Sequence, residues 1–405
     1  MRPSTGPGPS PCVTAPAYES PGRPGRPAGT RSVRPFVPGS VPGFERTGPQ
    51  RYKGTVTTDP APRSRPVTLE HVARAAGVSR ATVSRVINGE ATVDPRLRKL
   101  VEEAIARTSY VPNRAARSLV TRRTDSVALV VSEQERRDVT GPFVGRIFTD
   151  PYFGRVLTGL LEVLRPRGIQ VMLTLADDEA SRAQLLGYLQ QGHVDGVVLI
   201  SSHARDPLPG LLSRTALPAV LAARPAAPTP LTYVDVDQRA GALLAAERLL
   251  AEGRRRIATI AGPQDMPLAQ ERLSGFRAAL AERGHAEVPW TEGDFTQASG
   301  GAAMKWLLAE HPDLDGVFVA NDLMALGAVT TLHRAGRRVP EDVAVVGFDD
   351  SVSALACDPP LTTVRQPVEE MAAEMARLLL RQIESGERPL PSVVFHPSLV
   401  VRQSG

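Results

Sequence analysis

Between residues 79 and 88 the chain carries polar side chains that can bond to phosphates or to the edges of bases. These side chains are Arg80, Thr82, Ser84, Arg85 and Asn88. None of them is needed to pack the helix on which they are predicted to lie, because Val83, Val86 and Ile87 provide its apolar face. The pattern therefore predicts contact with DNA.

Two short helices joined by a tight turn are predicted to position these side chains. Thr68 can cap the first helix, and Gly77 ends it. Ser79 can cap the second helix, which Asn88-Gly89 closes. The apolar positions of the first helix recur at three- and four-residue spacing, at Leu69, Val72, Ala73 and Ala76. This arrangement is typical of a helix-turn-helix, although units of three helices that only pack together show similar patterns.

A third helix is predicted after Asp94, which can cap it, with Pro95 at its first position. Its apolar face is expected to contain Leu97, Leu100, Val101, Ala104 and Ile105. We therefore expect residues 67–111 to form an all-α DNA-binding domain.

Charge is distributed unevenly along the 405 residues. Basic residues outnumber acidic ones 21 to 9 in residues 1–125, whereas residues 126–405 carry 27 basic and 34 acidic residues. A basic front and an acidic body fit a DNA-binding module attached to a domain with another purpose. Two cysteines without metal-ligand spacing predict a reduced, cytoplasmic setting with no metal or cofactor. No apolar run approaches the ~18 residues that span a bilayer, so no membrane partner is expected.

Residues 1–66 are rich in Pro, Gly, Arg, Ser and Thr and have no helical or strand periodicity. Because they cannot bury enough apolar surface to offset the entropy of ordering, we expect a disordered, basic extension. This extension either adds non-specific affinity for DNA or results from a start site placed too far upstream. The abrupt onset of structural pattern at Val67 slightly favours the second interpretation.

After residue 125 the pattern changes to short apolar strands that alternate with amphipathic helices. Strands are predicted at 127–132, 169–176, 196–201, 219–223, 256–262, 316–320 and 343–348, and helices at 152–166, 179–191, 238–252, 269–283 and 323–335. This order predicts parallel sheets covered by helices on both faces. The pattern restarts after the Pro-rich stretch AARPAAPTP, so we expect two α/β lobes joined by short linkers around a cleft.

Polar residues follow several of these strands, at the sheet edge where ligands bind in such folds. Ser201, Asn321 and Asp349 are the clearest examples. Each of them could be only a helix cap or a turn residue, which is the commoner role of these types. Their convergence on one edge of a cleft favours a ligand site.

A series of phrases resembles the lactose/galactose repressor (LacI) family over essentially all of residues 67–402. The phrases include VTLEHVARAAGVSRATVSRVING, YVPNRAARSL, DPYF, YVDVDQRAGALLA, RIATIAGP, ERLSGFRAAL, VFVANDLMALGA, VPEDVAVVGFDD and PPLTTVRQP. The resemblance implies a helix-turn-helix domain, a hinge helix and linker at residues 112–124, and a two-lobed domain at residues 125–402 that resembles periplasmic binding proteins. It also implies a homodimer that binds double-stranded DNA at a pseudopalindromic operator.

The resemblance assigns roles on the DNA side. Arg80 and Ala81 occupy the positions that vary with operator sequence, and Arg85 resembles the family's major-groove arginine, which suits guanine. Ser79, Thr82, Ser84 and Asn88 would contact or pack near phosphates. In the hinge, Asn113 leads into a helix on which Ala115 and Ala116 allow close approach to the minor groove, and Leu119 would wedge into the central base step. Leu119 could instead be a core residue, but its polar surroundings leave no core for it to join.

The resemblance also assigns effector contacts in the cleft. Phe153 would stack on the ligand, and Arg272, Asn321, Asp349 and Gln366 would provide polar contacts. These groups suit a polyhydroxylated ligand, so a sugar is favoured as the effector, with a nucleobase, nucleoside or other metabolite as the alternative. Many relatives have an aspartate where this chain has Ala223, and the loop 133–149 is longer than usual, so the effector's identity stays open.

Two other classes of protein fit the sequence less well. An enzyme would need a catalytic motif, and the chain has no GxSxG, HExxH or Gly-Lys-Ser/Thr phosphate loop. A stand-alone sugar-binding protein would have a signal peptide and no fused helix-turn-helix. The chain ends soon after PSLVVRQ without a leucine heptad tail, which favours a dimer over a tetramer. The sequence therefore predicts a ligand-switched repressor, not an enzyme.

Overall fold

The computed structural model describes residues 67–405, except residues 91, 111–122, 134–146, 202 and 286. The extension predicted at 1–66 and the hinge positions Asn113, Ala115, Ala116 and Leu119 lie outside the described residues. Within the described ranges, no helix combines the length and the apolar character that a membrane crossing requires.

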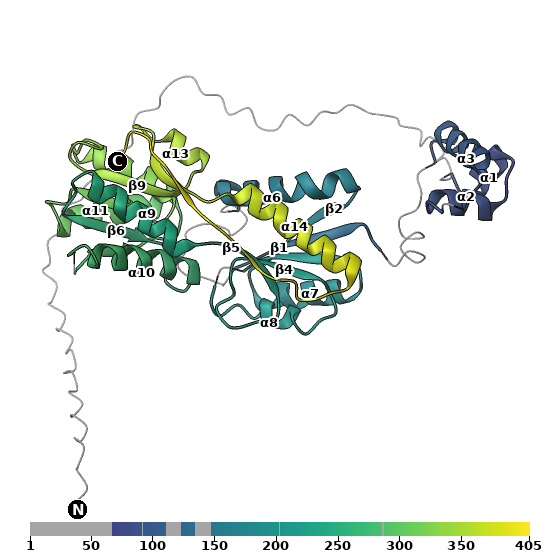
Figure 1. Cartoon of the computed structure of the whole chain (residues 1–405), viewed down its shortest axis with the longest axis horizontal. Helices are drawn as coiled ribbons and strands as arrows, with labels where there is room; N and C mark the ends of the chain where they lie inside the picture. Colours follow the sequence, from purple (N-terminus) through teal and green to yellow (C-terminus); the bar gives the residue numbers. More distant parts are fainter. Residues whose placement is uncertain (1–66, 91, 111–122, 134–146, 202, 286) are drawn as a thin grey trace, which may run out of the picture. The chain divides into compact units, whose positions relative to one another are not determined.

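Three helices form the helix-turn-helix at the positions predicted from the sequence (Figure 1). They are α1 (Leu69–Ala76), α2 (Arg80–Ile87) and α3 (Pro95–Thr108). Gly77 ends α1 in the left-handed conformation, at φ 67°, which glycine adopts easily because it has no Cβ. The Ser79 hydroxyl accepts a hydrogen bond from the backbone N–H of Thr82 at 3.1 Å, and Asp94 accepts one from the backbone N–H of Arg96 at 2.7 Å. Side chains therefore cap α2 and α3 as predicted.

The apolar face expected for α3 is partly wrong. Val101 and Ala104 are fully buried, but Leu97 and Leu100 are 37% and 46% exposed. Because Leu100 and Val101 are neighbours in the same turn of α3, the difference lies in the direction of their side chains: the buried side of α3 is narrower than the sequence pattern predicted.

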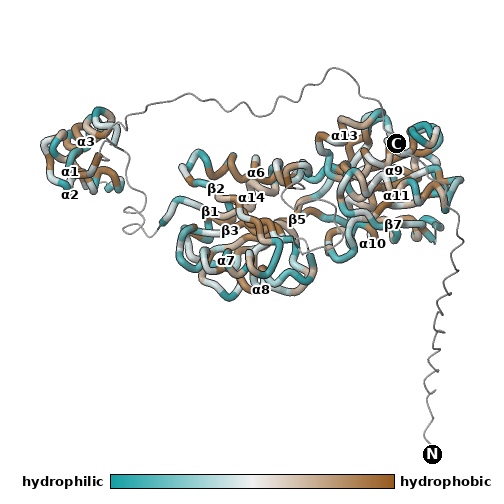
Figure 2. Tube along the Cα trace, turned by 180° about the vertical axis from the view of Figure 1, so that it is seen from behind, coloured by the Kyte–Doolittle hydropathy of each residue, from teal (hydrophilic) through white to brown (hydrophobic). Residues whose placement is uncertain are grey.

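The first lobe is a six-stranded parallel sheet with strand order β11-β5-β4-β3-β1-β2. Its strands are β1 (Ser126–Ser132), β2 (Gln170–Ala176), β3 (Gly196–Ser201), β4 (Ala219–Ala222), β5 (Thr232–Val236) and β11 (Val393–Phe395). Its helices are α6 (Pro151–Leu164), the 3-10 turn η1 (Arg165–Arg167), α7 (Glu179–Gln190), α8 (Leu208–Leu212) and α14 (Val368–Ser385). The central strands are apolar along their length, as Figure 2 shows in brown, because helices cover both faces of the sheet.

The second lobe is another six-stranded sheet, with order β12-β10-β9-β8-β6-β7. Its strands are β6 (Ile257–Ala261), β7 (Trp290–Glu292), β8 (Gly316–Val319), β9 (Ala344–Asp349), β10 (Thr362–Arg365) and β12 (Ser398–Val400). All neighbours are parallel except β10 and β12, which run antiparallel. Its helices are α9 (Gln238–Ala251), α10 (Pro267–Ala281), α11 (Gln297–Glu310), α12 (Asp322–Arg334) and α13 (Val352–Ala356).

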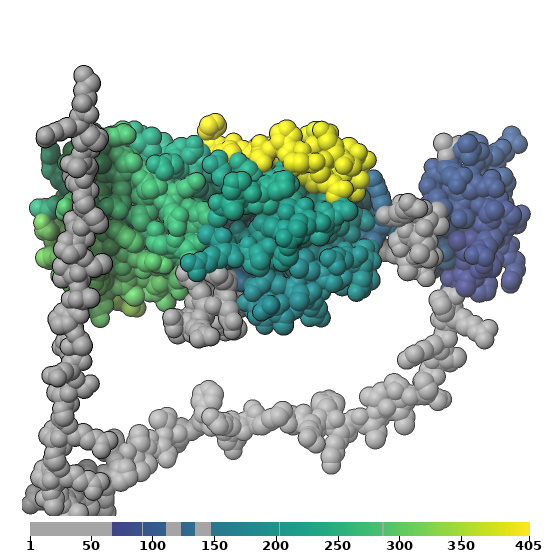
Figure 3. Space-filling view, turned by 90° about the horizontal axis from the view of Figure 1, so that it is seen from below, coloured from purple at the N-terminus to yellow at the C-terminus, as the bar shows by residue number. Residues whose placement is uncertain are grey.

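The lobes are not consecutive halves of the chain, which corrects the expected restart after the Pro-rich stretch. Strand β5 follows that stretch but completes the first sheet, and the chain enters the second lobe only at α9. The chain returns to the first lobe between β10 and α14, and it leaves again between β11 and β12. Figure 3 shows the yellow C-terminal residues lying against the teal first lobe.

Close packing of α14 on α6 explains this return. A Cβ on Gly159 of α6 would lie only 2.1 Å from the backbone oxygen of Glu369. Glycine at this position therefore lets the two helices approach each other at the backbone, and apolar residues of both join the same buried cluster. Because such contacts connect residues 210 positions apart, such as Gly159 and Glu369, local periodicity cannot reveal them.

Candidate functional site

Helix α2 presents most of the predicted DNA contacts on one face. At about 100° per residue, one side of the helix carries Arg80, Ala81, Ser84, Arg85 and Asn88. The opposite side carries Val83 and Val86, which are buried. Apart from the half-buried Ser84, this face is exposed, so it can enter a groove.

Two local contacts hold the N-terminal end of α2. The Thr82 and Ser79 hydroxyls lie 2.9 Å apart. Arg80 lies 3.2 Å from the Glu70 carboxylate, yet its side chain stays 72% exposed. This ion pair is therefore weak in water and leaves the Arg80 guanidinium available to a partner.

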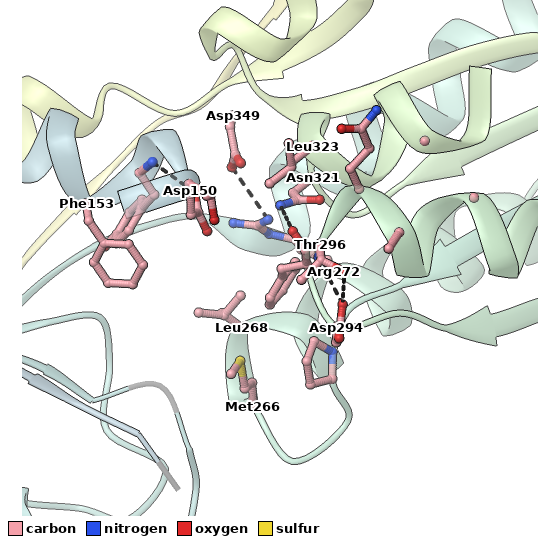
Figure 4. Close-up of a pocket in the computed structure, with 18 of the residues that line it drawn as sticks. Asp150, Phe153, Met266, Leu268, Arg272, Asp294, Thr296, Asn321, Leu323 and Asp349 are labelled. Carbon is pink, nitrogen blue, oxygen red and sulfur yellow. Dashed lines mark hydrogen bonds and ion pairs between the residues drawn. The ribbon is translucent and has the colours of Figure 1, made fainter. Parts of the chain in front are cut away.

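A cavity of about 1120 Å³ is lined by residues of both lobes. Of the predicted ligand contacts, it brings together Phe153, Arg272, Asn321, Asp349 and Gln366. Figure 4 shows Phe153 and Asp150, from the first lobe, facing Arg272 and Asp349 across this space. The cavity lies beyond the carboxyl ends of the strands, where ligands bind in sheets of this kind.

Arg272 on α10 is the buried cation of the cavity and is 3% exposed. Its Nε donates to the Gln238 side-chain oxygen at 2.7 Å, and its Nη1 donates to the Ala320 carbonyl at 2.6 Å. Its guanidinium also stacks on the Phe348 ring, 3.7 Å from the centroid. Burial lowers the pKa of Arg272, but three neighbours hold the charge in a defined orientation.

Asp349, at the end of β9, is the carboxylate that faces this cation, with 3.8 Å between Oδ1 and Arg272 Nη1. The Gln366 amide donates to the same oxygen at 2.6 Å. Burial raises the pKa of Asp349 to about 7, against the lowering effect of Arg272, and the charge of Asp150 adds to the rise. Its backbone adopts φ 116°, a strained value for a residue with a side chain, and strain of this kind concentrates at functional sites.

Arg155 links this carboxylate residue to the first lobe. It forms a two-pronged pair with Glu369, with both N–O distances at 2.7 Å, and its Nη1 donates to the Asp349 carbonyl at 2.9 Å. Arg155 and Glu369 belong to the first lobe and Asp349 to the second. A displacement of the Asp349 backbone would therefore be transmitted to α6 through Arg155.

Aromatic and aliphatic side chains form the apolar part of the cavity. Phe153 and Tyr152 project from α6, with their rings edge to face at 5.6 Å, while Phe295, Met266 and Leu268 come from the second lobe. A ligand between the lobes would therefore meet apolar faces on two sides, which suits the flat faces of a sugar ring.

Two predicted contacts are placed differently from the rest. Asn321 lines the cavity, but its oxygen accepts from the Met324 backbone at 2.9 Å and its amide donates to the Phe295 carbonyl at 3.1 Å. It is thus a helix cap that also borders the site. Ser201 is not among the described residues that line the cavity; its hydroxyl donates to Asp206 at 2.6 Å. Ser201 takes the turn role that its residue type commonly has.

Sequence reasoning did not find several residues of the cavity. Asp235, at the end of β5, accepts from the Gln238 amide at 3.0 Å and from the Arg224 backbone at 2.9 Å. It thereby fixes Gln238, which in turn holds Arg272. The sequence YVDVDQ contained the signal, but the strand that includes Asp235 was not predicted. Asp150, Asp294 and Tyr152 were also missed, whereas Ala223 does line the cavity, as the absent aspartate suggested.

Acidic groups dominate the charged lining of the cavity. Glu133, Asp150, Asp235, Asp294 and Asp349 line it, against the cations Arg272, Lys305 and Arg334. Because carboxyl groups outnumber cations in the lining, an anionic ligand is disfavoured, whereas neutral hydroxyl groups could donate to the carboxylates. Within the part of the chain that the structure describes, no group of His, Cys, Asp and Glu could hold a metal ion.

Comparison with known proteins agrees with this arrangement. The model of bacterial regulatory proteins of the lacI family matches residues 68–113, and that of a periplasmic-binding-protein-like domain matches residues 246–405. The HTH-type transcriptional regulator CelR of Thermobifida fusca is 49% identical over 348 residues, which are 85% of this chain and 99% of CelR. The ribose operon repressor of Halalkalibacterium halodurans is 32% identical, over 83% of this chain and 96% of that protein.

Solved structures give the same result. The complex of CelR with cellobiose has a TM-score of 0.65 at 46% identity and covers 84% of this chain and 100% of CelR. The Lac repressor dimer bound to operator and an anti-inducer has a TM-score of 0.72 at 27% identity and covers 84% and 99%. These relatives are regulators of transcription and not enzymes, which rules out the enzyme considered from the sequence. The chain therefore belongs to the lacI family of bacterial DNA-binding transcriptional regulators.

Proposed function

We propose that this regulator is a repressor whose affinity for operator DNA changes when a neutral sugar occupies the cleft. The observation that carries the proposal is the buried group of Arg272, Asp349 and Gln366 between apolar faces from both lobes. A carboxylate, an amide and a guanidinium can bind neighbouring hydroxyl groups, while the aromatic rings cover the apolar face of the ring.

The class of sugar follows from charge and from the relatives. The acidic lining disfavours phosphorylated sugars. CelR was solved with cellobiose and is 46% identical to this chain in that structure, so cellobiose is the first candidate. A nucleobase or nucleoside is the second candidate, since it would stack on the same aromatic faces, but it would offer fewer hydroxyl groups to the carboxylates.

On the DNA side, we infer that Arg80 and Ala81 select the operator and that Arg85 contacts a guanine in the major groove. Ser79, Thr82, Ser84 and Asn88 would contact or lie near phosphates. The Lac repressor was solved as a dimer on its operator, so a homodimer on a pseudopalindromic site is proposed for this chain. A cytoplasmic location is part of the proposal, because the DNA that a bacterial regulator binds lies there.

The domain limits form part of the same proposal: a basic extension at 1–66, a DNA-binding domain at 67–111, a hinge at 112–124 and an effector domain at 125–402. Asn113, Ala115, Ala116 and Leu119 remain predicted minor-groove contacts of the hinge.

Titration calorimetry with cellobiose, ribose, adenosine and glucose 6-phosphate tests the effector. We expect cellobiose to bind and glucose 6-phosphate not to bind. Phe153→Ala should weaken cellobiose binding, whereas Phe148→Ala should not, because Phe148 is 76% exposed and does not line the cavity. Binding of adenosine alone would contradict a sugar effector.

Footprinting on the DNA upstream of the chain's own gene tests the regulator's response. A protected site that weakens or strengthens when cellobiose is added would support the proposal. A protected site that ignores every bound ligand would contradict the switch while leaving DNA binding intact.

A further inference from the structure

His203 connects the two lobes at a point outside the group of predicted effector contacts. It follows β3 in the first lobe and is only 5% exposed. Its Nε2 contacts the Glu133 carboxylate at the end of β1, and its Nδ1 lies 2.7 Å from Oδ2 of Asp265. Asp265 belongs to the second lobe, in the loop between β6 and α10. The backbone joins the same contact, since Ala204 N–H donates to the Asp265 carbonyl at 2.9 Å.

This cluster lies toward the opposite edge of each sheet from the segments that connect the lobes. The connections leave the first lobe at β5 and β11 and enter the second lobe near β10 and β12, at one edge of each sheet. Glu133 and His203 follow β1 and β3, and Asp265 follows β6, all toward the other edge. If the lobes open about the segments that connect them, the distance between His203 and Asp265 must increase more than the distances between residues close to those segments.

The chemistry of the cluster depends on a proton. A protonated imidazole donates from both nitrogens and can satisfy two carboxylates at once, whereas a neutral imidazole donates from only one. Burial opposes the charge on His203, but the hydrogen bonds and charges of Glu133 and Asp265 outweigh it and raise the pKa of this histidine. Asp206, the other acid of the same loop, is occupied by Ser201 and by the Leu208 backbone.

We propose that protonated His203 is an interlobe latch, which holds the cleft closed by binding Glu133 of the first lobe and Asp265 of the second. Below the raised pKa of His203 the latch is complete, and as pH rises through that pKa one of the two contacts is lost and the open form becomes more populated. Since Glu133 also lines the cavity, the latch would couple closure to the shape of the effector site. The consequence for effector binding rests on the proposed function, but the latch itself does not.

Distance measurement on the ligand-free full chain tests the latch without any effector. Spin labels at Arg214→Cys in the first lobe and Glu282→Cys in the second, with Cys12→Ser, report the separation of the lobes by pulsed electron resonance. We expect a short, narrow distribution at pH 5.5 and a longer, broader one at pH 8.5. In His203→Gln the distribution should be long at both values of pH.

Two further variants keep the experiment decisive. His193→Gln removes an exposed histidine of the same lobe, which contacts Gln191 and Tyr188, and should behave as the wild type. Asp265→Asn keeps the His203–Glu133 contact within the first lobe but removes the interlobe charge, so it should also open the cleft. This variant tests the latch even if His203→Gln fails to fold. A wild type whose distances do not depend on pH, or variants that keep the same dependence, would overturn the latch.

Cellobiose binding provides a separate readout. With the latch, cellobiose should dissociate on the order of tenfold faster from His203→Gln than from the wild type at pH 5.5, and the difference should shrink at pH 8.5. If cellobiose does not bind at all, the proposed effector fails while the distance measurement still decides the latch. If cellobiose leaves both proteins equally fast at pH 5.5, the latch does not act on the effector site.

Discussion

Helix α2 and the cleft both depend on arginine, but they hold it in opposite ways. The side chain of Arg80 is 72% exposed and that of Arg272 is 4% exposed. Arg80 on α2 contacts the surface carboxylate of Glu70, whereas the cleft arginine is oriented by an amide, a backbone carbonyl and an aromatic ring. The predicted DNA-binding surface therefore keeps its arginine exposed to solvent until DNA binds, whereas the folded protein already fixes the orientation of the arginine in the effector site.

The largest expected effect comes from Arg272→Met. The change removes a buried charge and one of the partners of Asp349 and of Gln238, so we expect the free energy of unfolding to fall by about 3–5 kcal/mol and effector binding to be lost. Urea denaturation and calorimetry measure the two. Arg277→Met, on the exposed side of the same helix, is the control and should change neither. If Arg272→Met has the stability of the wild type, the contacts of Arg272 in the cleft contribute no more to folding than the surface contact of Arg80 on α2.

The next effect is the pH dependence of Asp349. Because burial raises its pKa to about 7 in the folded protein, its protonated form is favoured by folding. Its contribution to stability is therefore complete at low pH, below the pKa of an unfolded aspartate, and is lost as pH rises toward 7.

We expect the free energy of unfolding of the wild type, relative to Asp349→Asn, to fall by up to about 1.4 kcal/mol per pH unit between pH 4 and 7 and to level off above. Urea denaturation at a series of pH values measures this difference. A difference in the free energy of unfolding that stays constant with pH would contradict a raised pKa of Asp349 in the folded protein.

On the other side of the comparison, Arg85→Ala should weaken operator binding by about 1–3 kcal/mol and relax base preference at one position. Because Arg85 is exposed, the melting temperature and cellobiose affinity should not change. Gel-shift titration on the wild-type operator and on single-base variants measures the effect, with the exposed Arg214→Ala of the first lobe as control. Unchanged base preference would reject the contact.

The smallest effect is expected from Glu70→Gln, which removes the surface partner of Arg80. Hydrogen bonds to the backbone and to Thr68 lower the pKa of Glu70, and Arg80 adds only a minor part, as expected of an exposed pair. The melting temperature should stay within error, and operator affinity should change by no more than about twofold. A large loss of operator affinity would show that Glu70 orients Arg80 for DNA binding before DNA is present. The arginine on α2 would then be held in place by the folded protein, as Arg272 is in the cleft.

The two regions also differ in how far the sequence predicts them. The caps of the helix-turn-helix, from Ser79 to Asp94, are local contacts between neighbours in the chain, and these were predicted correctly. In the cleft, residue type and position after a strand pointed to Asn321 and Asp349, and resemblance added Arg272 and Gln366. Asp235 was missed because its strand was missed, and Ser201 was included because a strand end alone does not say which way a side chain turns.

The amino-acid sequence was enough to predict the helix-turn-helix, the central strands of both sheets, the polar surface of α2 and the family, because capping, periodicity and motif spacing are properties of short segments. It did not predict the strands β5, β7, β10, β11 and β12, nor the helices α8, α11, α13 and α14. Tertiary contacts determine which lobe contains α14 and β11 and which groups orient Arg272. They also determine which carboxylates share the cavity and that His203 bridges to Asp265. Each of these depends on backbone approach and burial between residues far apart in the chain, and no local pattern records the environment that sets a buried group's partners or its pKa.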